Sequence, residues 1–498
     1  MCRHVWLIIP VLLSLSLLLN AQTVDPDVVL EGEVTGAQHK TYFEVPFDVP
    51  ADVHRLSVDF TYSGKDAHTA LDLGIEDPER FRGNSGGNKS HFTIAASDAT
   101  PSYLPGAILR GKWKLLISVP NIRPTERSRY RVEIRFNSTL EDRSFTLSPL
   151  ATVTRWYRGD LHMHTAHSDG SCLSQSGRSI PCPVFFTVQT AAERGLDFIA
   201  ITDHNATSQY EAMRELQPYF DRLLLIPGRE ITTFRGHFNI YGVTQYVDYR
   251  VVPGKRDVDA ILREVRAQGG IASVNHADSP DGEICMGCGW KPSHPVDMAL
   301  FTGVEVINGG RIMLSSAAFW DRGIAGGLRL TGIGGSDNHN GPAASNVAGA
   351  IADPTTVVEA NELSVPAILQ GIRMGRVFID LSGSRDKVID IEASDSSAPA
   401  TVHSRMGGVL KAPADHTIAF VVTTAACPRS TVHLFLDGHE TSVLPPLSTT
   451  IGDESLPFTW ASDGRAHWLR AEVRDSNGSL MLVSNPIYIN FPTTEKTQ

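Results

Sequence analysis

The stretch Arg158-Gly-Asp-Leu-His162-Met-His164-Thr-Ala-His-Ser-Asp169-Gly decides how the middle of this chain is interpreted. His162 and His164 are two residues apart, so on an extended strand both imidazoles point to the same side. Two imidazoles held side by side can bind one divalent ion together. The stretch therefore predicts a strand whose end carries the first ligands of a metal site.

Four further segments carry the same kinds of side chain at the ends of apolar runs. They are Ile201-Thr-Asp-His204-Asn, Gly228-Arg-Glu230, Val274-Asn-His276-Ala-Asp and Gly334-Gly-Ser-Asp337-Asn-His339-Asn. Imidazole and carboxylate suit zinc, manganese or iron. A single histidine beside a strand is more often structural than a ligand, but five such segments together are hard to obtain by chance. We predict eight metal ligands: His162, His164, Asp169, His204, Glu230, His276, Asp337 and His339.

Apolar strands alternate with amphipathic helices from Trp156 onwards. The expected strands are residues 197–201, 222–226, 270–274, 303–307 and 330–334. The expected helices are residues 184–194, 258–267, 317–324 and 365–374, and three of them end at Gly195, Gly269 and Gly375. Apolar strands flanked by helices indicate a parallel sheet buried on both faces.

The position of the ligands selects between two α/β architectures. Five strands carry ligands at their C-terminal ends, and a closed or nearly closed β/α barrel builds its active site at that rim. An open doubly wound sheet is the alternative, but it gathers ligands only near a switch point. A barrel is therefore the better fit.

The regions on either side of the barrel alternate apolar and polar residues in short runs, as at 113–119 and 417–422. Such runs, separated by turn residues, predict β-sandwiches, and the C-terminal one is expected to be immunoglobulin-like. A chain of 498 residues suggests three domains at about 150 residues each. The predicted domains are 22–155, 156–395 and 396–498.

The N-terminal residues are typical of a secretory signal. Arg3 supplies a positive end, residues 6–19 are apolar, and residues 20–22 offer a cleavage region. The apolar run is shorter than the ~20 residues that a membrane span needs. We therefore predict a signal peptide at 1–21 and a secreted or periplasmic protein.

The net charge limits which binding partners are expected, and the cysteines bear on which disulfides form. The net charge is −11 and no Lys/Arg-rich run occurs, so no stable nucleic-acid partner is expected, and the expected partner is a small-molecule substrate. The oligomeric state is open. In an oxidising compartment we favour disulfides Cys172–Cys182 and Cys285–Cys288, although a swap between the pairs stays open. A thiol pair in a second metal site and two unpaired thiols are the alternatives for Cys285 and Cys288.

The ordered ligand set resembles the PHP (polymerase and histidinol phosphatase) domain over roughly residues 156–390. The chain also resembles the metallohydrolase subgroup that includes carbaryl hydrolases. The features that carry this resemblance are the secretory segment, the loops Cys172–Cys182 and Cys285–Cys288, and Val304-Glu-Val-Ile-Asn308-Gly. The resemblance implies a distorted (β/α)7 barrel that carries two or three divalent ions, zinc, manganese or iron. Asn308 stands where trinuclear members supply a His or Cys ligand.

The resemblance also implies how the ligands are divided. One ion would be held by His162, His164, Glu230 and Asp337. A second would be held by Asp169, His204 and His339. Glu230 would bridge to a third ion held by His276, and the occupancy of that third position stays open because of Asn308.

The expected chemistry is hydrolysis by a metal-activated water. Phosphoesters are the first choice, because phosphoester hydrolysis is the commonest activity in the family that the chain resembles. Aryl carbamates or carboxylic esters are the alternative, and the subgroup resemblance supports them directly. A second alternative is a surface-binding protein whose metals are structural, although closed structural sites rarely mix ligands in this way.

Two residues are predicted to assist the metals. His237 is the candidate acid for the leaving group, and a structural role for it stays open. Asp203 is a candidate catalytic helper, as is Arg229, although residues beside metal ligands often orient imidazoles instead. His167 and Asp160 are expected to have that lesser role or none.

Overall fold

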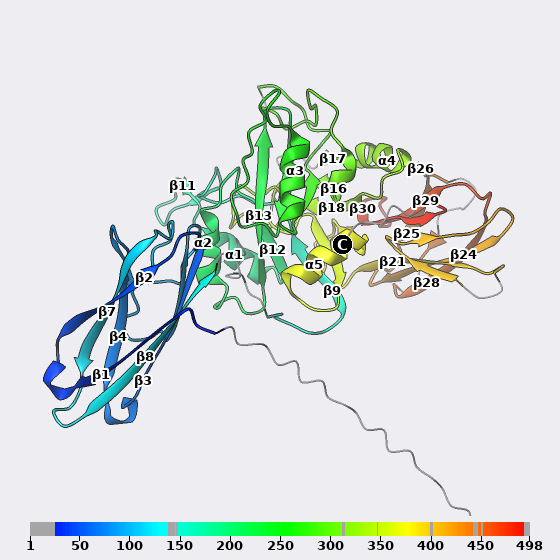
Figure 1. Ribbon diagram of the computed structural model, residues 1–498. Coiled ribbons are helices and arrows are strands. Elements are labelled where there is room, and N and C mark those ends of the chain that lie inside the picture. Colours follow the sequence, from blue (N-terminus) through cyan, green and yellow to red (C-terminus); the bar gives the residue numbers. More distant parts are fainter. Residues whose placement is uncertain are drawn as a thin grey trace, which may run out of the picture. The chain divides into compact units, whose positions relative to one another are not determined.

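A computed structural model describes residues 25–137, 145, 148–283, 285–310, 314–345, 347–398, 402–441, 447–449 and 452–492. The chain divides into two compact units, residues 1–140 and 141–498, and each is described by itself (Figure 1). The predicted signal segment 1–21 lies outside the described residues. Within the described ranges no helix is long and apolar enough to cross a membrane.

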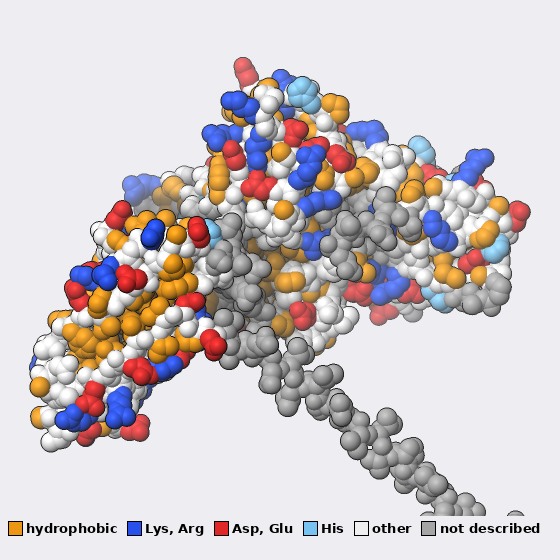
Figure 2. Space-filling model, viewed as in Figure 1, with side chains coloured by type: hydrophobic (Ala, Val, Ile, Leu, Met, Phe, Trp, Pro, Cys, Tyr) orange, Lys and Arg blue, Asp and Glu red, His pale blue; other side chains and the backbone are white. Residues whose placement is uncertain are grey.

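The first unit consists of two antiparallel sheets of four strands, with orders β1-β8-β3-β6 and β2-β7-β4-β5. The strands are β1 (Val28–Thr35), β2 (Tyr42–Val49), β3 (Arg55–Tyr62), β4 (Ala70–Glu76), β5 (Phe81–Asn84), β6 (His91–Ala95), β7 (Gly111–Asn121) and β8 (Arg127–Asn137). Alternate side chains of β7, such as Trp113 and Leu115, are buried in one core between the sheets. This confirms the all-β pattern predicted for the region. Figure 2 shows hydrophobic side chains on the surface of this unit, where Tyr42 is exposed.

The second unit contains a closed barrel that positions the predicted ligands. Seven of its strands pair in the order β9, β12, β13, β14, β15, β16 and β18, and we call these seven strands the barrel wall. These strands are β9 (Arg155–Asp160), β12 (Phe198–Ile201), β13 (Leu224–Thr233), β14 (Gly236–Tyr241), β15 (Ile271–Val274), β16 (Gly303–Asn308) and β18 (Thr331–Gly335). A bridge between Met163 and Asn338 joins β9 to β18, and the His164 N–H donates to the Asn338 carbonyl at 2.7 Å.

One strand of the wall departs from the predicted parallel arrangement. β14 is antiparallel to both β13 and β15, whereas β9, β12 and β13 are parallel to one another, as are β15, β16 and β18. β13 and β14 are joined by the two residues Phe234 and Arg235, which permit a hairpin but not a parallel crossover. The unit is thus mixed α/β and strand-rich, and the distorted (β/α)7 barrel stays a prediction.

Among the described residues of this unit, five α-helices accompany the strands: α1 (Val184–Glu193), α2 (Gln209–Leu216), α3 (Val258–Ala267), α4 (Ala317–Ala325) and α5 (Val365–Met374). The Asp257 carboxylate caps α3 by accepting from the Ala260 N–H. Gly195, Gly269 and Gly375 follow α1, α3 and α5 with φ values of 73°, 78° and 72°. These left-handed conformations favour glycine, which confirms the three predicted helix ends.

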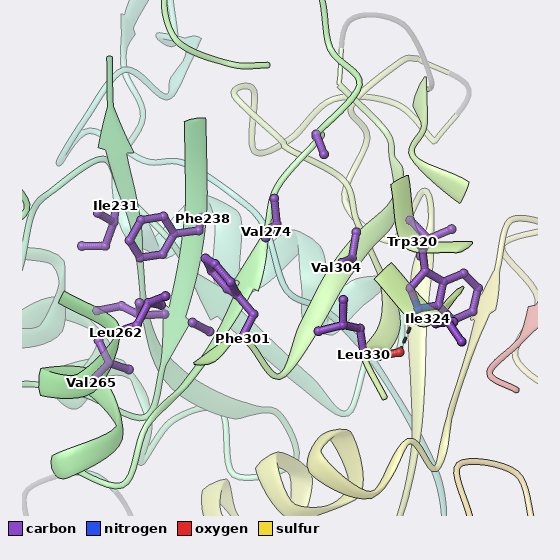
Figure 3. Packing of buried hydrophobic residues seen from close by; sticks show 14 of the residues in the cluster. Ile231, Phe238, Leu262, Val265, Val274, Phe301, Val304, Trp320, Ile324 and Leu330 are labelled. Atoms are coloured by element: carbon purple, nitrogen blue, oxygen red, sulfur yellow. Dashed lines mark hydrogen bonds between the residues drawn. The ribbon is translucent and has the colours of Figure 1, made fainter. Parts of the chain in front are cut away.

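The apolar faces of α3 and α4 pack on the barrel wall (Figure 3). Ile261, Leu262 and Val265 recur at helical spacing on α3 and are fully buried. On α4, Trp320 is fully buried and its indole N–H donates to the Leu330 carbonyl at 2.8 Å. The packing fixes the strands whose ends carry the ligands.

The C-terminal region contains a sheet of order β22-β21-β24-β28. Its strands are β21 (Val388–Asp395), β22 (Val402–Arg405), β24 (Thr417–Ala425) and β28 (Glu454–Ala461). They share a core with β23 (Val409–Leu410), β25 (Thr431–Leu436), β29 (His467–Arg474), β30 (Leu480–Ser484) and β31 (Ile487–Ile489). The immunoglobulin-like topology stays a prediction.

Backbone pairing joins this region to the barrel. Strand β19 (Thr355–Ala360) pairs with β9 and with β20 (Val377–Asp380), and β20 pairs with β30. In addition, β21 lies in the C-terminal sheet although it precedes the boundary expected at residue 395. Residues 141–498 therefore form one compact unit, and a division into three independent domains remains a prediction.

Replacing Trp320 with alanine is expected to lower the free energy of unfolding of the second unit by about 3–5 kcal/mol, because it leaves a cavity and an unpaired Leu330 carbonyl. Chemical denaturation of the full chain measures this change. Ala318→Ser, on the exposed face of the same helix, is the control and should change the unfolding free energy little. Equal stability of W320A and the parent would contradict the packing described here.

Candidate metal centre

The eight predicted ligands lie at one end of the barrel. His162 and His164 follow β9, His204 follows β12, and His276 follows β15. Asp337 and His339 follow β18, and Asp169 lies in the loop after β9. Glu230 differs because it lies within β13, which continues into the hairpin with β14. The C-terminal strand ends therefore meet as the sequence predicts.

Glu230 lies at the centre of the group and is 1% exposed. Its Oε2 atom lies 3.5 Å from His162 Nε2, 3.6 Å from His164 Nε2 and 2.9 Å from His204 Nδ1. Its Oε1 atom lies 3.4 Å from both His276 Nε2 and His237 Nδ1. The two oxygens of one carboxylate thus face two different sets of imidazoles.

The first ligand group contains His162, His164 and Asp337. Asp337 Oδ1 lies 3.3 Å from His162 Nε2 and 3.2 Å from His164 Nε2. Both Nε2 atoms are buried and have no hydrogen-bond partner. Ligands about 2.1 Å from one ion lie about 3.0–3.5 Å from each other, so a divalent ion fits this group.

The second ligand group contains His164, Asp169, His204 and His339. Asp169 Oδ1 lies 3.3 Å from His339 Nε2 and 3.6 Å from His204 Nε2. The side chains of Asp169 and His339 are 59% and 40% exposed, whereas His164 is fully buried. This group therefore opens to solvent and shares His164 with the first group.

Two ligands adopt left-handed backbone conformations that residues other than glycine seldom take. His276 has a φ of 27° and Asp337 has a φ of 51°. Each such residue costs about 1–3 kcal/mol, and such strain is concentrated at functional sites. Hydrogen bonds hold these positions, because the His276 N–H donates to Glu305 Oε2 at 3.1 Å and Asn308 Nδ2 donates to Asp337 Oδ2 at 3.3 Å.

Charges within the group shift its titration in the metal-free chain. Burial alone would raise the pKa of Glu230, but His204 and His162 hold that pKa well below its usual value. Burial and the neighbouring His339 lower the pKa of His164 to about 4. Burial also opposes the charged form of His339, yet Asp169 and Asp337 raise the pKa of His339 to about 9.

Glu305 is a site residue to which the sequence prediction gave no role. It is 1% exposed in β16, and its Oε1 atom lies 3.0 Å from His162 Nδ1. Its Oε2 atom accepts from the His276 N–H and from Asn308 Nδ2. Its signal in the sequence was an acidic residue inside an apolar strand. Such a carboxylate fixes the orientation of a ligating imidazole.

Asp203 supports a loop in the structure. Its carboxylate accepts three hydrogen bonds of 2.7 Å, from the Thr165 N–H, the Thr165 hydroxyl and the Ser168 hydroxyl. Because the side chain is fully buried and engaged on both oxygens, this geometry favours a positioning role over the predicted catalytic one. Asp160 is similar, since it accepts from the N–H groups of Ser336 and Ala352.

The remaining predicted helpers, His237, Arg229 and His167, differ in whether they contact a ligand. His237 is 5% exposed at the start of β14, and its Nε2 atom has no partner. Arg229 is fully buried and donates to the Gln245 carbonyl. His167 Nδ1 lies 2.7 Å from the Ser208 hydroxyl. Of these, only His237 contacts the ligand group through Glu230.

Both favoured disulfides are confirmed, Cys172–Cys182 and Cys285–Cys288. The first lies on a hairpin of β10 (Ser171–Leu173) and β11 (Ser179–Pro181). The Ser171 N–H donates to the His339 carbonyl at 2.7 Å, so this disulfide loop borders the second ligand group. Disulfides of this kind are compatible with an extracellular or periplasmic location.

No family model matches the chain, and no curated protein matches it. Among solved structures it is similar to a two-domain protein from Bacteroides vulgatus that contains a predicted PHP-like metal-dependent phosphoesterase. The identity is 17%, the match covers 70% of this chain and 99% of that chain, and the TM-score is 0.37. A similarity this weak carries no conclusion about the present chain, and it does not bear on the carbaryl hydrolase subgroup.

Replacing Glu305 with glutamine is expected to weaken divalent-ion binding by about 10–100-fold. Glutamine has one oxygen where Glu305 has two, so its amide group must face either His162 Nδ1 or the His276 N–H, both of which need an acceptor. Competition against a coloured chelator measures the affinity. The exposed Glu215→Gln should bind ions like the parent, and an unchanged E305Q would exclude the orienting role.

Ion binding is expected to release protons at pH 7.5 and to tighten as the pH rises towards about 9, because His339 is protonated below its raised pKa and must lose that proton to bind an ion. Calorimetric titration in two buffers of different ionisation enthalpy counts the protons released. His339→Gln should release about one proton fewer than the parent. Equal proton release by the two proteins would rule out this role of His339.

Proposed function

We propose that this chain is a metal-dependent hydrolase that acts first on phosphoesters. The observation that carries the proposal is that His164 belongs to both ligand groups, which would place two ions next to each other. Paired ions suit in-line displacement at phosphorus, because one stabilises the attacking oxygen and the other the leaving oxygen. The proposed cofactors are two or three divalent ions of zinc, manganese or iron.

The eight predicted ligands are the residues proposed to hold these ions. His162, His164, Glu230 and Asp337 would hold one ion and Asp169, His204 and His339 a second, while His276 with Glu230 would hold a third where three ions are bound. Divalent ions bound here would supply Lewis acidity and lower the pKa of water. Glu305 keeps the Nε2 atom of His162 directed at Asp337 and Glu230, so the first group is prepared before an ion binds.

His237 is proposed as the proton donor to a poor leaving group. Its Nδ1 atom lies 3.4 Å from Glu230 Oε1, and its Nε2 atom faces no acceptor among the described residues. A proton held at Nε2 would therefore be available to an incoming leaving oxygen. The neighbouring His276 and Glu230 keep the ring next to the ligand groups.

The exposure of the second group favours catalysis over a purely structural role for the metals. A structural site is closed by protein ligands, whereas a catalytic site keeps a position open. Asp169 is 59% exposed, so solvent reaches this group directly. The surface-binding hypothesis would require a closed site and is the weaker alternative.

A specific observation supports aryl esters or carbamates as the second candidate. Phe234 and Met286 are 96% and 78% exposed, and they lie on the β13–β14 turn and on the loop between Cys285 and Cys288, a few positions before His237 and Cys288 in the sequence. The ring of Trp290 lies against Gly236, where even a Cβ atom would lie 2.5 Å from it. An apolar, aromatic border of this kind suits an aryl group.

Several broader assignments accompany the proposal. We infer a secreted or periplasmic hydrolase of the PHP type, with a carbaryl hydrolase-like loop pattern. Its partner would be a small-molecule substrate, with no stable nucleic-acid partner. On the described face in Figure 2, basic and acidic side chains lie interspersed, which supports this choice.

The test compares hydrolysis of bis-p-nitrophenyl phosphate and 1-naphthyl N-methylcarbamate by the full chain loaded with Mn²⁺ or Zn²⁺. Metal-dependent turnover of the phosphodiester is expected, with its loss in His162→Ala because that substitution removes a ligand. His167→Ala, which removes an imidazole whose Nδ1 atom lies 2.7 Å from the Ser208 hydroxyl, should keep the activity.

Each outcome separates the candidates. Turnover of the carbamate alone would replace the first choice with the ester and carbamate assignment. Failure to hydrolyse either compound, with folded protein and bound metal, would favour the surface-binding hypothesis.

A further inference from the structure

A third cluster of metal-binding side chains lies on the Oε1 side of Glu230. A ring nitrogen of His237, a ring nitrogen of His276 and the Cys288 sulfur all lie within 4.8 Å of one another. The three residues are 5%, 5% and 4% exposed. They come from β14, from the end of β15 and from the loop after it, so the fold gathers them from separate segments.

Each imidazole has a ring nitrogen that could bind a cation. His276 Nδ1 lies 3.3 Å from the Cys288 carbonyl, and His276 Nε2 faces Glu230 Oε1 at 3.4 Å. His237 Nδ1 lies 3.4 Å from Glu230 Oε1, and His237 Nε2 is buried without a hydrogen bond. A buried polar atom without a partner is costly, and a bound cation would remove that cost.

The state of Cys288 decides whether this cluster can hold an ion. In the structure Cys288 forms a disulfide with Cys285, and a disulfide sulfur is not a thiolate. The thiolate is the form of cysteine that binds metals. Cys285 is exposed, whereas Cys288 is buried beside the histidines, so a reductant can reach the pair from outside.

We propose that the Cys285–Cys288 disulfide is a redox switch on a third metal site, in which reduced Cys288 joins His237 and His276 to hold one zinc-like divalent ion. Two nitrogens and one thiolate suit such an ion. In the disulfide state the Cys288 sulfur is bonded to Cys285 and is not a thiolate, so the site lacks its third ligand. The proposed third ligand, Cys288, comes from a loop. The family resemblance places the corresponding ligand at the end of β16, where this chain has Asn308.

The chemical step is a thiol–disulfide exchange with a dithiol. The dithiol loses two hydrogens and becomes a cyclic disulfide, while the Cys285–Cys288 bond breaks and each sulfur gains one hydrogen. The Cys288 thiol then releases its proton as the ion binds. If His237 donates a proton as proposed above, binding an ion would withdraw it from that role.

The test counts Co²⁺ ions bound by the metal-stripped full chain and records the thiolate-to-cobalt absorption in the near ultraviolet. Cys285→Ser leaves the Cys288 thiol free without any reductant, and Cys288→Ser removes the ligand. Without reductant, C285S should bind about one Co²⁺ more per chain than the parent and show the thiolate absorption. C288S should show neither, and dithiothreitol should convert the parent to the behaviour of C285S.

Two controls isolate the effect. Comparing C285S with the parent without reductant leaves Cys172–Cys182 intact in both, and His237→Ala in the C285S background should remove the additional ion. Cys427 is buried in the core of the C-terminal region and belongs to none of the possible ligand groups among the described residues, so it is not expected to add a signal. Equal ion counts for C285S and C288S without thiolate absorption would overturn the proposal. If C285S does not fold, reduced parent and reduced C288S give the same comparison.

Discussion

The buried carboxylate of Glu230 is the group on which the rest of the site depends. A carboxylate that is 1% exposed needs compensating partners, and imidazoles surround it on both sides. Its Oε2 atom faces His162, His164 and His204, while its Oε1 atom faces His237 and His276 and accepts from Asn275 at 2.9 Å. Cations bound on either side would offset the energetic cost of removing the Glu230 carboxylate from water. At this end of the barrel, the carboxylates and imidazoles stabilise one another, and several imidazole nitrogens still lack a hydrogen-bond partner and could bind an ion.

Much of this site could be predicted from the sequence, because the signals were local. Each ligand follows an apolar run, and parallel strands bring their C-terminal ends to one rim, so His162, His204 and His276 meet without knowledge of distant contacts. Helix ends at glycine were equally local. The pairing of His162 with Glu305 joins residues far apart in the chain, so an acidic residue inside an apolar strand is visible in the sequence but its partner is not.

The departures from the prediction have one physical origin, which is pairing between distant segments. The antiparallel β14 entered the barrel wall because a two-residue turn folds it back on β13. Strand β20 pairs with β30, about a hundred residues later, so backbone pairing crosses the boundary expected near residue 395, and that boundary stays a prediction. Hydrophobic periodicity identifies a strand but does not choose its neighbour.

The antiparallel strand also explains why the two sides of Glu230 differ. A parallel strand after β13 would have required a crossover helix, and its ligand would have pointed from the rim as the others do. The hairpin instead brings His237 beside Glu230 and places its turn against the cysteine loop, where Gly287 leaves no room for a side chain next to Thr233. The Oε2 side is therefore built from strand ends and opens to solvent at Asp169, whereas the Oε1 side is closed by a hairpin and a loop. A substrate could therefore reach the ions on the Oε2 side, while the proposed disulfide switch acts on the buried Oε1 side of the same carboxylate.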